Sequence, residues 1–364
     1  MTEAEAYFAL NLVPDVGPIR CRRLVERFGS AERALRASVG ELRGVEGIGA
    51  ELAANVADWE RVGQPEEERR RAAEMGLTLL TLADETYPPL LREIYDAPLV
   101  LYVKGEVPAR WRRGLAVVGS RLTTRYGVEM THKLSYQIAY AGVPVVSGLA
   151  RGIDTAAHKG ALAAKGVTWA VIGCGLGHLY PPENEELADK IVAGGGLLMS
   201  EFPLDVRPDR RTFPRRNRIV SGLSFGVLVT EAGSGSGALI TARQALEQGR
   251  SVFAMPGRID NPSCKGCHEL IKEGAALAEG AEDILAELEF LLPPAEVVEA
   301  RPLPPDLSDA EKLVFESIGS EEAPLDLLIQ KTGLPSAKVS STLLRLEMKK
   351  LVRQLPGKHF VKTA

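Results

Sequence analysis

The sequence predicts an α/β protein with a parallel β-sheet at its core and helices on both faces of that sheet. From Leu115 onward, short β-branched runs alternate with helical stretches, and this spacing is typical of βαβ units. Each run ends in small or polar residues, and ligands of open α/β sheets bind at the carboxyl ends of the strands. We therefore expect one shared binding site at that edge of the sheet.

Composition limits the class of protein and its partners. The chain has 364 residues, enough for two or three domains, and its formal net charge is −4, so any nucleic-acid surface must be local. There is no run of about 18 apolar residues to span a membrane, and the N-terminus lacks the basic region of a signal peptide. Four cysteines do not make a disulfide framework in a chain of this length. We expect a cytoplasmic protein.

Residues 1–65 predict a helical domain that contains two similar hairpins, at 12–18 and 42–49. Each hairpin places glycine in a tight turn between amphipathic helices, which resembles the helix-hairpin-helix pattern whose amides meet a DNA phosphate. The alternative is a small helical bundle that uses glycine only for turn geometry. The acidic residues Asp15 and Glu46 inside the hairpins favour that alternative.

The main domain is expected to span residues 77–290. A charged stretch at 66–74 precedes it, and residues 86–105 are expected to form a short extended segment because their prolines disfavour long helices. The expected strands are 77–82, 115–120, 143–148, 167–173, 196–201, 225–232 and 251–257.

An arginine-rich segment carries the strongest functional signal. Residues 205–218 contain six arginines and two aspartates, with Phe213 in the middle. Arginine forks grip phosphates in a bidentate way, and an aromatic ring gives an unpaired base a surface on which to stack. This combination indicates nucleic-acid binding.

Two motifs earlier in the chain follow expected strands. Gly119-Ser120-Arg121 offers a sharp turn, a hydroxyl and a cation, or alternatively only a helix-capping turn. In residues 147–162, Asp154 and His158 lie four residues apart, as an acid–base pair would on one helix face. A capping aspartate and a histidine that hydrogen-bonds within the site are the favoured interpretation.

Two glycine-rich segments bear on cofactors. Residues 173–184 read G-x-G-x-G after the strand at 167–173, the third counted from Leu115, rather than after the first, which argues against an NAD dehydrogenase. Tyr180, Pro181 and Asn184 either line a pocket or only shape the loop. Residues 231–246 can form a nest of backbone N–H groups for a phosphate, the alternative being a plain turn. They lack the lysine of a Walker A sequence, so no ATP hydrolysis is expected.

The Cys264-x-x-Cys267 pair, followed by His268, suggests zinc, redox chemistry or haem attachment. Zinc normally needs a second ligand pair, and Cys21 and Cys174 are distant. A redox motif would begin a helix in a thioredoxin-like unit, whereas this pair stands in a loop sequence. We expect the pair to be structural or incidental, with no metal bound.

The C-terminal region predicts a linker and a small domain. Residues 291–306 form a proline-containing linker, and 307–364 show three helical patterns and two short strands, as in a winged helix. Between residues 335 and 362 there are seven basic residues and one acid. The winged helix is expected to contact duplex DNA or a protein, and the sequence leaves both open.

Together, VVGSR, SGLARGIDTAAHKGAL, FPRRNRIVSGLS, EAGSGSGALITA and MPG…NPSCKGCHELIKEGA closely resemble the DNA-processing protein A family (DprA, also called Smf) in order and spacing. The resemblance implies an extended Rossmann-like domain, flanked by a helix-hairpin-helix or SAM-like domain and a winged helix. It also implies a homodimer, without cofactor or catalytic activity, that binds single-stranded DNA in natural transformation and recombination. Such proteins protect incoming strands and help to load the RecA recombinase.

The resemblance also implies the DNA-binding residues. Ser120 and Arg121 should lie in a basic pocket, Phe213 should stack on a base, and Arg216 and Arg218 should lie near phosphates. The full expected set is Gly119, Ser120, Arg121, Arg210, Phe213, Arg216, Asn217, Arg218, Gly235, Ser236, Gly237 and Thr241.

The alternative function is a nucleotide-processing hydrolase with a related fold. Such an enzyme needs a positioned carboxylate, and Glu231, at the end of the strand at 225–232 (the fifth counted from Leu115), is the best candidate. The favoured interpretation is that Glu231 instead hydrogen-bonds an arginine such as Arg216 or Arg218 and holds it in place.

Overall fold

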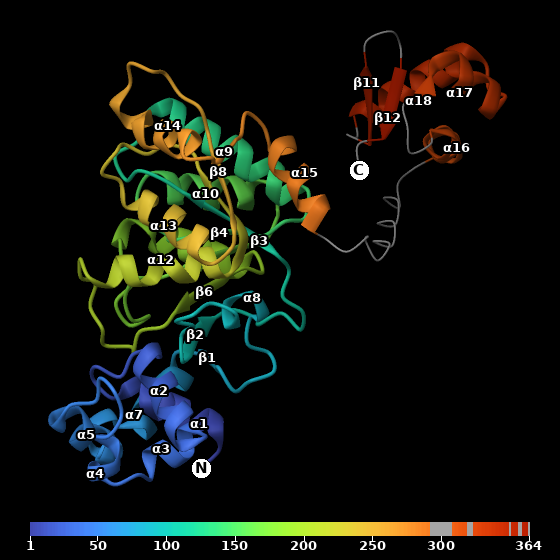
Figure 1. The fold of residues 1–364 in the computed structure, drawn as a ribbon. Coiled ribbons are helices and arrows are strands. Elements are labelled where there is room, and N and C mark those ends of the chain that lie inside the picture. Colours follow the sequence, from blue (N-terminus) through green and yellow to red (C-terminus); the bar gives the residue numbers. More distant parts are fainter. Residues whose placement is uncertain (292–307, 319–322, 349–350, 356–358, 363–364) are drawn as a thin grey trace. The chain divides into compact units, whose positions relative to one another are not determined.

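The computed structural model describes residues 1–291, 308–318, 323–348, 351–355 and 359–362 (Figure 1). The chain divides into two compact units, residues 1–292 and 293–364, and each is described by itself. The linker expected at 291–306 lies outside the described residues apart from Leu291.

The first unit is built on a nine-stranded sheet with the strand order β1-β2-β6-β5-β4-β3-β7-β8-β9. Neighbours from β6 to β9 in this order are parallel, and β1 and β2 form an antiparallel edge. The predicted α/β class with a mostly parallel sheet is therefore confirmed. The strands are β1 (Thr78–Thr81), β2 (Val100–Lys104), β3 (Gly114–Val118), β4 (Val145–Ser147), β5 (Thr168–Val171), β6 (Leu197–Ser200), β7 (Ser224–Val229), β8 (Ser251–Ala254) and β9 (Ala276–Leu277).

Residues 86–105 form more than the short extended segment that the sequence predicts. They contain α8 (Pro89–Arg92) and β2, which pairs with both β1 and β6. The run Val100–Val103 is fully buried, because a strand with neighbours on both edges and cover on both faces is apolar throughout. That run lacks alternation, so its period does not distinguish a strand from a buried helix.

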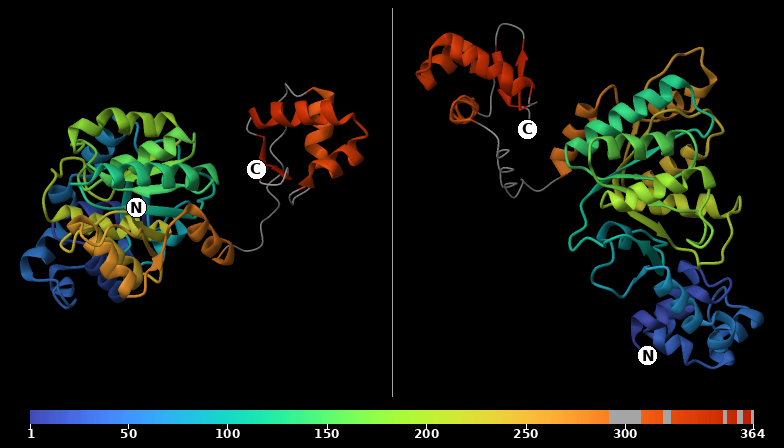
Figure 2. Two further views of the ribbon diagram at one scale, coloured as in Figure 1. Left: turned by 90° about the horizontal axis from the view of Figure 1, so that it is seen from above. Right: turned by 180° about the vertical axis from the view of Figure 1, so that it is seen from behind.

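Helices cover both faces of the sheet (Figure 2). Successive residues of β3 show the division, because side chains alternate across a strand. Leu115 and Val117 pack with α9 (Arg125–Tyr140), α10 (Ile153–Ala163) and α15 (Ala281–Leu291), and α11 (Glu185–Ala193) lies beside α10. Ala116 and Val118 pack with α12 (Thr212–Gly222), α13 (Gly237–Glu247) and α14 (Lys265–Lys272).

The strand order creates a switch point between β3 and β7. From β3 the chain adds β4, β5 and β6 on one side, and then returns to add β7 and β8 on the other. The loops after β3 and β7 therefore diverge and leave a crevice at the carboxyl edge of the sheet.

Seven helices precede the sheet and belong to the same compact unit. They are α1 (Glu3–Leu12), α2 (Pro18–Phe28), α3 (Ala31–Leu35), α4 (Val39–Leu42), α5 (Ala50–Ala57), α6 (Trp59–Gly63) and α7 (Pro65–Glu74). The charged stretch 66–74 is thus helix α7. Its buried Glu68 accepts a hydrogen bond from the Leu204 N–H (2.7 Å), and Arg71 forms a two-bond ion pair with Asp205, so α7 attaches these helices to the sheet domain.

The second unit has the helix and strand order of a winged helix, as predicted. It contains α16 (Asp309–Ser317), β10 (Ala323–Pro324), α17 (Leu325–Thr332), α18 (Ser336–Met348), β11 (Val352–Leu355) and β12 (His359–Lys362). The strands form a small antiparallel sheet in the order β10-β12-β11. Its core includes Val314, Leu328, Val339, Leu343 and Phe360.

Within the described residues, no helix is long and apolar enough to cross a membrane. Cys264 and Cys267 are buried and form no disulfide, and burial raises the pKa of the Cys267 thiol to about 12. The expectation that the pair lies in a loop is wrong, since Cys264 is the N-cap of α14 and Cys267 lies in its first turn. The described residues contain no group of three or more His, Cys, Asp or Glu side chains arranged to hold a metal ion.

Candidate nucleic-acid interface

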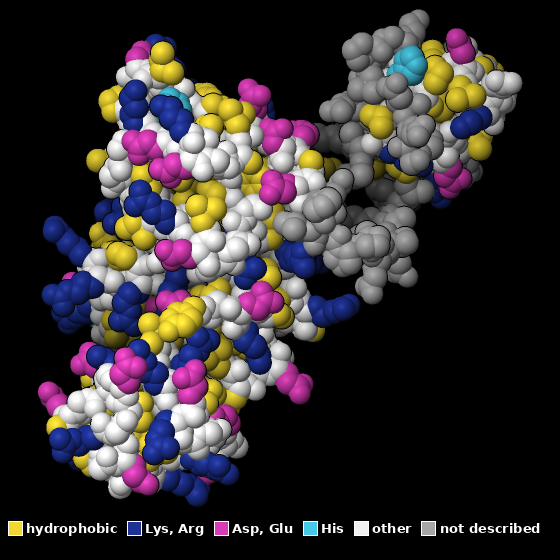
Figure 3. All heavy atoms as spheres, viewed as in Figure 1, with side chains coloured by type: hydrophobic (Ala, Val, Ile, Leu, Met, Phe, Trp, Pro, Cys, Tyr) yellow, Lys and Arg dark blue, Asp and Glu magenta, His cyan; other side chains and the backbone are white. Residues whose placement is uncertain are grey.

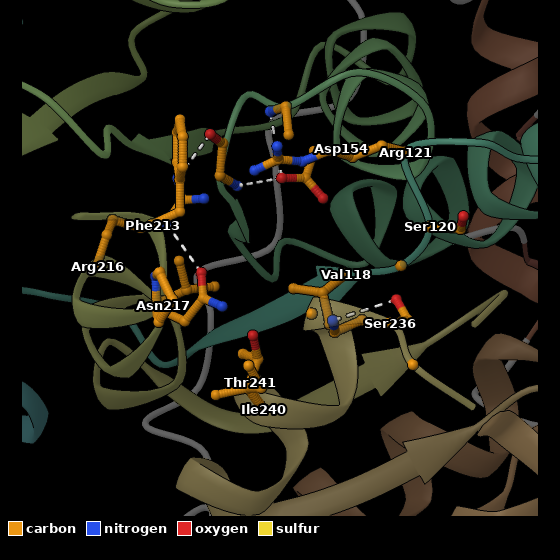
Figure 4. Close-up of a pocket in the computed structure, with 18 of the residues that line it drawn as sticks. Val118, Ser120, Arg121, Asp154, Phe213, Arg216, Asn217, Ser236, Ile240 and Thr241 are labelled. Atoms are coloured by element: carbon orange, nitrogen blue, oxygen red, sulfur yellow. Dashed lines mark hydrogen bonds between the residues drawn. The ribbon is translucent and has the colours of Figure 1, made fainter. Parts of the chain in front are cut away.

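A cavity of about 570 Å³ lies at the switch point, lined by the loops that follow β3, β4 and β7 and by the first turns of α12 and α13 (Figure 4). Eleven of the twelve predicted site residues line it, and Arg218 does not. The eleven are Gly119, Ser120, Arg121, Arg210, Phe213, Arg216, Asn217, Gly235, Ser236, Gly237 and Thr241.

Phe213 stands at the start of α12, with its ring at the wall of the cavity. The ring lies against Gly173, where a Cβ would come within 2.7 Å of Phe213 Cδ1, so only glycine leaves room for it. The Arg121 guanidinium lies over the ring, 4.6 Å from its centroid. The structure thus places the predicted stacking residue and a predicted cation of the basic pocket in direct contact.

The glycine-rich turn after β7, residues 233–237, lines the cavity, and no side chain of the described residues covers its backbone at Gly235 or Gly237. Ser236 caps α13, its Oγ accepting the Ala238 N–H at 3.3 Å. A Cβ at Gly235 or Gly237 would meet nothing within 4 Å, so the space in front of this turn is open. Backbone N–H groups and the positive end of the helix dipole make this helix start suited to an anion.

The loop after β4 forms a further wall and is held by two buried side chains, Asp154 and Asn184. Asp154 accepts the N–H groups of Gly148 (3.1 Å) and Ala150 (3.2 Å), and Asn184 donates to the Leu149 carbonyl at 2.8 Å. These bonds hold Leu149 at a φ of 58°, which is uncommon outside glycine. Asn184 therefore holds the neighbouring loop after β4 rather than its own loop at 173–184, and it does not line the cavity.

Arg216 lines the cavity but is a structural residue of its wall. Only 4% of the residue is exposed, and its guanidinium donates to the carbonyls of Gly148 (2.7 Å) and Val171. Burial lowers the pKa of Arg216, and the neighbouring Asp154 carboxylate opposes that shift. Arg216 is expected to lie near phosphates. In the structure it supports the wall of the cavity, and its guanidinium is not exposed for a phosphate to bind.

Arg218 lies outside the cavity, contrary to the predicted set. The helical turn of α12 points it to the opposite side, where it is 6% exposed and pairs with Glu201 and with Asp96 (3.0 Å). Its charge is therefore used in a buried ion-pair network and is not available to a ligand in the cavity.

Two of the predicted polar groups have different environments. The Ser120 hydroxyl donates to the Leu122 carbonyl (2.6 Å) and accepts the Leu122 N–H (3.1 Å), so it stabilises its own turn. Arg210 is exposed at the cavity, and no hydrogen bond or ion pair of its side chain is present among the described residues. In Figure 3 Lys and Arg side chains gather at the left edge, at the height of α12 in Figure 1.

The prediction that Glu231 binds Arg216 or Arg218 is wrong. Both of its carboxylate oxygens accept hydrogen bonds from Thr124, one from the N–H (2.8 Å) and one from the hydroxyl. Thr124 is the N-cap of α9, and its Oγ1 accepts the Gly127 N–H at 3.0 Å. Glu231 is 1% exposed and so ties the end of β7 to the start of α9.

The favoured interpretation of a capping Asp154 and a histidine bonded within the site is wrong: Gly152 is the N-cap of α10 and no side chain of the described residues caps it, and His158 is buried and bonds a residue outside the lining of the cavity. The His158 Nδ1 lies 2.7 Å from the Thr168 hydroxyl, which itself donates to the Val145 carbonyl. Burial lowers the pKa of His158 to about 3, so the ring is neutral. Asp154 makes no hydrogen bond to His158; burial raises the Asp154 pKa, against the lowering effects of Arg216 and of its backbone donors.

Sequence reasoning missed the contribution of the loop after β4 and left Tyr180 undecided. Gly148, Ala150 and Asp154 all line the cavity. The signal was present, since Gly148 and Gly152 leave room for close approach, but burial of Asp154 follows from packing against Arg216 and cannot be read from spacing.

Two family models match the chain. That described as "DNA recombination-mediator protein A" matches residues 78–289, and that described as "DprA winged helix domain" matches residues 298–358. The chain belongs to the DNA-processing protein A (DprA/Smf) family. The resemblance found in the sequence is thereby confirmed, and the cavity lies inside the part that the first family model covers.

Known relatives extend the match. The chain is 45% identical over 285 residues to protein Smf of Escherichia coli, which covers 77% of this chain and 76% of that protein. It is 35% identical over 393 residues to protein Smf of Synechocystis, which covers 99% of this chain and 98% of the relative.

Two solved DprA structures are similar to this one. The structure of DprA from Streptococcus pneumoniae matches with a TM-score of 0.69 and 35% identity, over 79% of this chain and 98% of the other. The DprA structure from Helicobacter pylori matches with a TM-score of 0.52 and 28% identity, over 59% and 98%, and is described as giving insights into a unique single-stranded DNA binding mode.

Proposed function

We propose that this protein binds single-stranded DNA in the cavity at the switch point, without catalysis, and acts as a DNA-processing protein of transformation and recombination. One observation carries the proposal. A stacking ring, Phe213, two exposed arginines, Arg121 and Arg210, and the open start of α13 line the same cavity. Arginine and helix-start amides suit phosphates, and the ring suits an unpaired base.

The contact between Arg121 and Phe213 gives the binding step a simple form. A base that stacks on the covered face of Phe213 takes the place of the guanidinium, which is released toward a phosphate. Duplex DNA has its bases already stacked and paired, so this exchange favours single strands. The single-strand binding described for the Helicobacter pylori relative supports the same function here.

The hydrolase alternative is not favoured by the geometry of its candidate residue. A general acid or base must reach the substrate. Glu231 is buried, absent from the lining of the cavity, and hydrogen-bonded to Thr124 through both oxygens.

Two further roles complete the proposal and rest on family membership. We propose that the protein acts as a homodimer that protects incoming strands and helps to load the RecA recombinase. The test is RecA filament assembly on an oligonucleotide that is first covered by this protein. Unchanged assembly kinetics would remove the loading role and leave strand binding intact.

The cavity is tested by fluorescence anisotropy with a labelled oligothymidine and a duplex of equal length. Each charge-assisted hydrogen bond contributes about 1.5–3 kcal/mol, so the double variant R121A/R210A should bind the single strand at least about a hundredfold more weakly. It should also show a shallower salt dependence, because fewer counterions are released.

The matched control is the double variant K133A/K272A, which also removes two exposed positive charges but from helices that do not line the cavity. Its affinity should stay within about twofold of the unmodified protein. If the control loses as much affinity as R121A/R210A, binding depends on overall charge, and the proposed cavity is wrong.

A further inference from the structure

A second arginine–aromatic pair lies beside the first. The Arg151 guanidinium lies over the Tyr180 ring, 5.7 Å from its centroid, just as Arg121 lies over Phe213 at 4.6 Å. The two rings are themselves neighbours, with centroids 6.0 Å apart and planes inclined by 47°. Tyr180 comes from the loop after β5, and Arg151 from the loop after β4, so four different segments meet here.

The second pair is continuous with the proposed DNA cavity. Tyr180, Pro181 and Arg151 line a small hollow together with Arg121, Gly148, Ala150 and Phe213, and those four also line the main cavity. A strand whose base stacks at Phe213 therefore meets Tyr180 next, without crossing another wall.

Arg151 is held by an acidic neighbour in this structure. Its Nε donates to Glu183 and its Nη1 lies 3.4 Å from the Tyr180 hydroxyl. Arg151 and Glu183 are both half exposed, so solvent screens their attraction and a phosphate can compete for the guanidinium. The hydrogen bond to Arg151 lowers the pKa of the Glu183 carboxyl, which is therefore charged at neutral pH.

We propose that Tyr180 and Arg151 form a second nucleotide subsite, in which Tyr180 stacks on the base adjacent to the one at Phe213 and Arg151 leaves Glu183 to bind the intervening or flanking phosphate. This inference rests on the proposed function. It adds that the DNA strand leaves the main cavity past Tyr180 and Arg151. The Glu183 carboxylate competes with a DNA phosphate for the Arg151 guanidinium and so weakens DNA binding.

The stacking part is tested by a cycle between protein and oligonucleotide. Tyr180→Leu removes the ring and Tyr180→Phe keeps it, and a series of oligothymidines carries a single abasic site at successive positions. Base–aromatic stacking is worth about 1–3 kcal/mol, so Y180L should weaken binding about 5- to 100-fold and Y180F less than twofold. The loss caused by Y180L should disappear for the oligonucleotide that lacks the base at that subsite.

The abasic arm keeps the test informative if Y180L disturbs the loop. A disturbed loop weakens binding to every oligonucleotide equally, whereas a lost stacking partner matters only where the base is present. An equal loss across the abasic series, or no loss at all, overturns the subsite.

The Arg151 part is tested by substitutions that each remove one charge. Glu183→Gln frees Arg151 and should tighten binding several-fold, and this gain should vanish in the R151A background. The control is Glu186→Gln, which removes another nearby exposed carboxylate, one paired with Lys190 at 2.7 Å rather than with Arg151. Equal effects of E183Q and E186Q mean that only general repulsion is relieved, which contradicts the competitor role.

The outcomes separate this inference from the function on which it rests. If R121A/R210A loses affinity while Y180L and R151A do not, the main cavity stands and the second subsite is wrong. If R121A/R210A binds single strands as tightly as the unmodified protein, the proposed function itself is wrong, and the subsite that rests on it is wrong as well.

Discussion

At the residue scale, burial divides the arginines of one short segment into two groups. Arg216 and Arg218 are buried and bound to backbone carbonyls or carboxylates, whereas Arg210 and Arg211 are exposed. A buried arginine with its partners in place shapes the cavity, and an exposed one is available to a ligand. The same residue type thus serves structure and binding within nine positions of the chain.

Replacing Arg216 by alanine should destabilise the protein strongly. The change leaves the Gly148 carbonyl without this donor and the buried Asp154 without its nearest cation. Breaking a buried charge arrangement in this way costs about 3–5 kcal/mol, measured as the free energy of unfolding in urea. Arg211→Ala, which removes an exposed arginine from the same segment, should cost less than about 0.5 kcal/mol. Equal losses for the two variants would contradict the structural role.

His158 should make stability depend on pH in a defined window. Its pKa is about 3 in the folded protein and about 6.5 in the unfolded chain, so the unfolded state binds the proton between these values. The free energy of unfolding should therefore fall as pH drops below about 6.5, by up to about 1.4 kcal/mol per pH unit from this group. Asp154, whose folded pKa is raised, contributes with the opposite sign.

The variant His158→Asn isolates this contribution. Asparagine has no titrating group, and its amide can replace the Nδ1 hydrogen bond to Thr168. Urea unfolding at pH 5 and pH 7 should show a smaller difference for H158N than for the unmodified protein. Identical pH dependence in both would show that His158 does not titrate on unfolding.

At the element scale, the start of α9 depends on the end of β7. The N-cap Thr124 accepts the Gly127 N–H and is itself bound by Glu231, which lies two residues beyond the end of β7. The cap thereby also anchors the Gly119–Thr124 loop that carries Arg121. A local capping signal and a distant carboxylate together position a wall of the cavity.

Substitution of Thr124 tests this anchor. Thr124→Ala removes the cap and leaves Glu231 buried with fewer donors, so unfolding free energy should fall by about 1–3 kcal/mol. Thr124→Ser keeps the hydroxyl and should lose less than about 0.5 kcal/mol. If the alanine and serine variants unfold at the same urea concentration, the hydroxyl does not act as the anchor.

At the scale of the whole molecule, the cavity belongs to one unit alone. All of its lining residues lie within residues 1–292, and the winged helix is a separate compact unit with its own core. The switch point of the sheet creates this cavity, because the loops after β3 and β7 diverge there. Its binding should therefore not require the C-terminal unit.

Removal of residues 293–364 tests that independence. The shortened protein should still bind oligothymidine, and R121A/R210A should weaken its binding by the same factor as in the full chain, measured by anisotropy. Any duplex binding that is lost on truncation then belongs to the winged helix. If truncation abolishes the effect of R121A/R210A on single strands, the cavity is not an independent site.

The sequence predicted the parallel sheet, the helices around it and eleven residues that line one cavity. The fold and the edge of the sheet follow from local strand and helix periods and from the shared carboxyl edge of parallel strands, whereas the individual site residues were implied by the resemblance to the DprA/Smf family. The same local reasoning missed β2, whose continuous apolar run has no alternation.

The amino-acid sequence was enough to establish the fold class, the family and the edge of the sheet at which the site lies. Three-dimensional packing determines which arginines are buried, that Glu231 binds Thr124, and that Tyr180 lies beside Phe213. The physical reason is that burial and hydrogen-bond partners arise between segments far apart in the chain: Thr124 and Glu231 are 107 residues apart, and Arg216 and Gly148 are 68 apart.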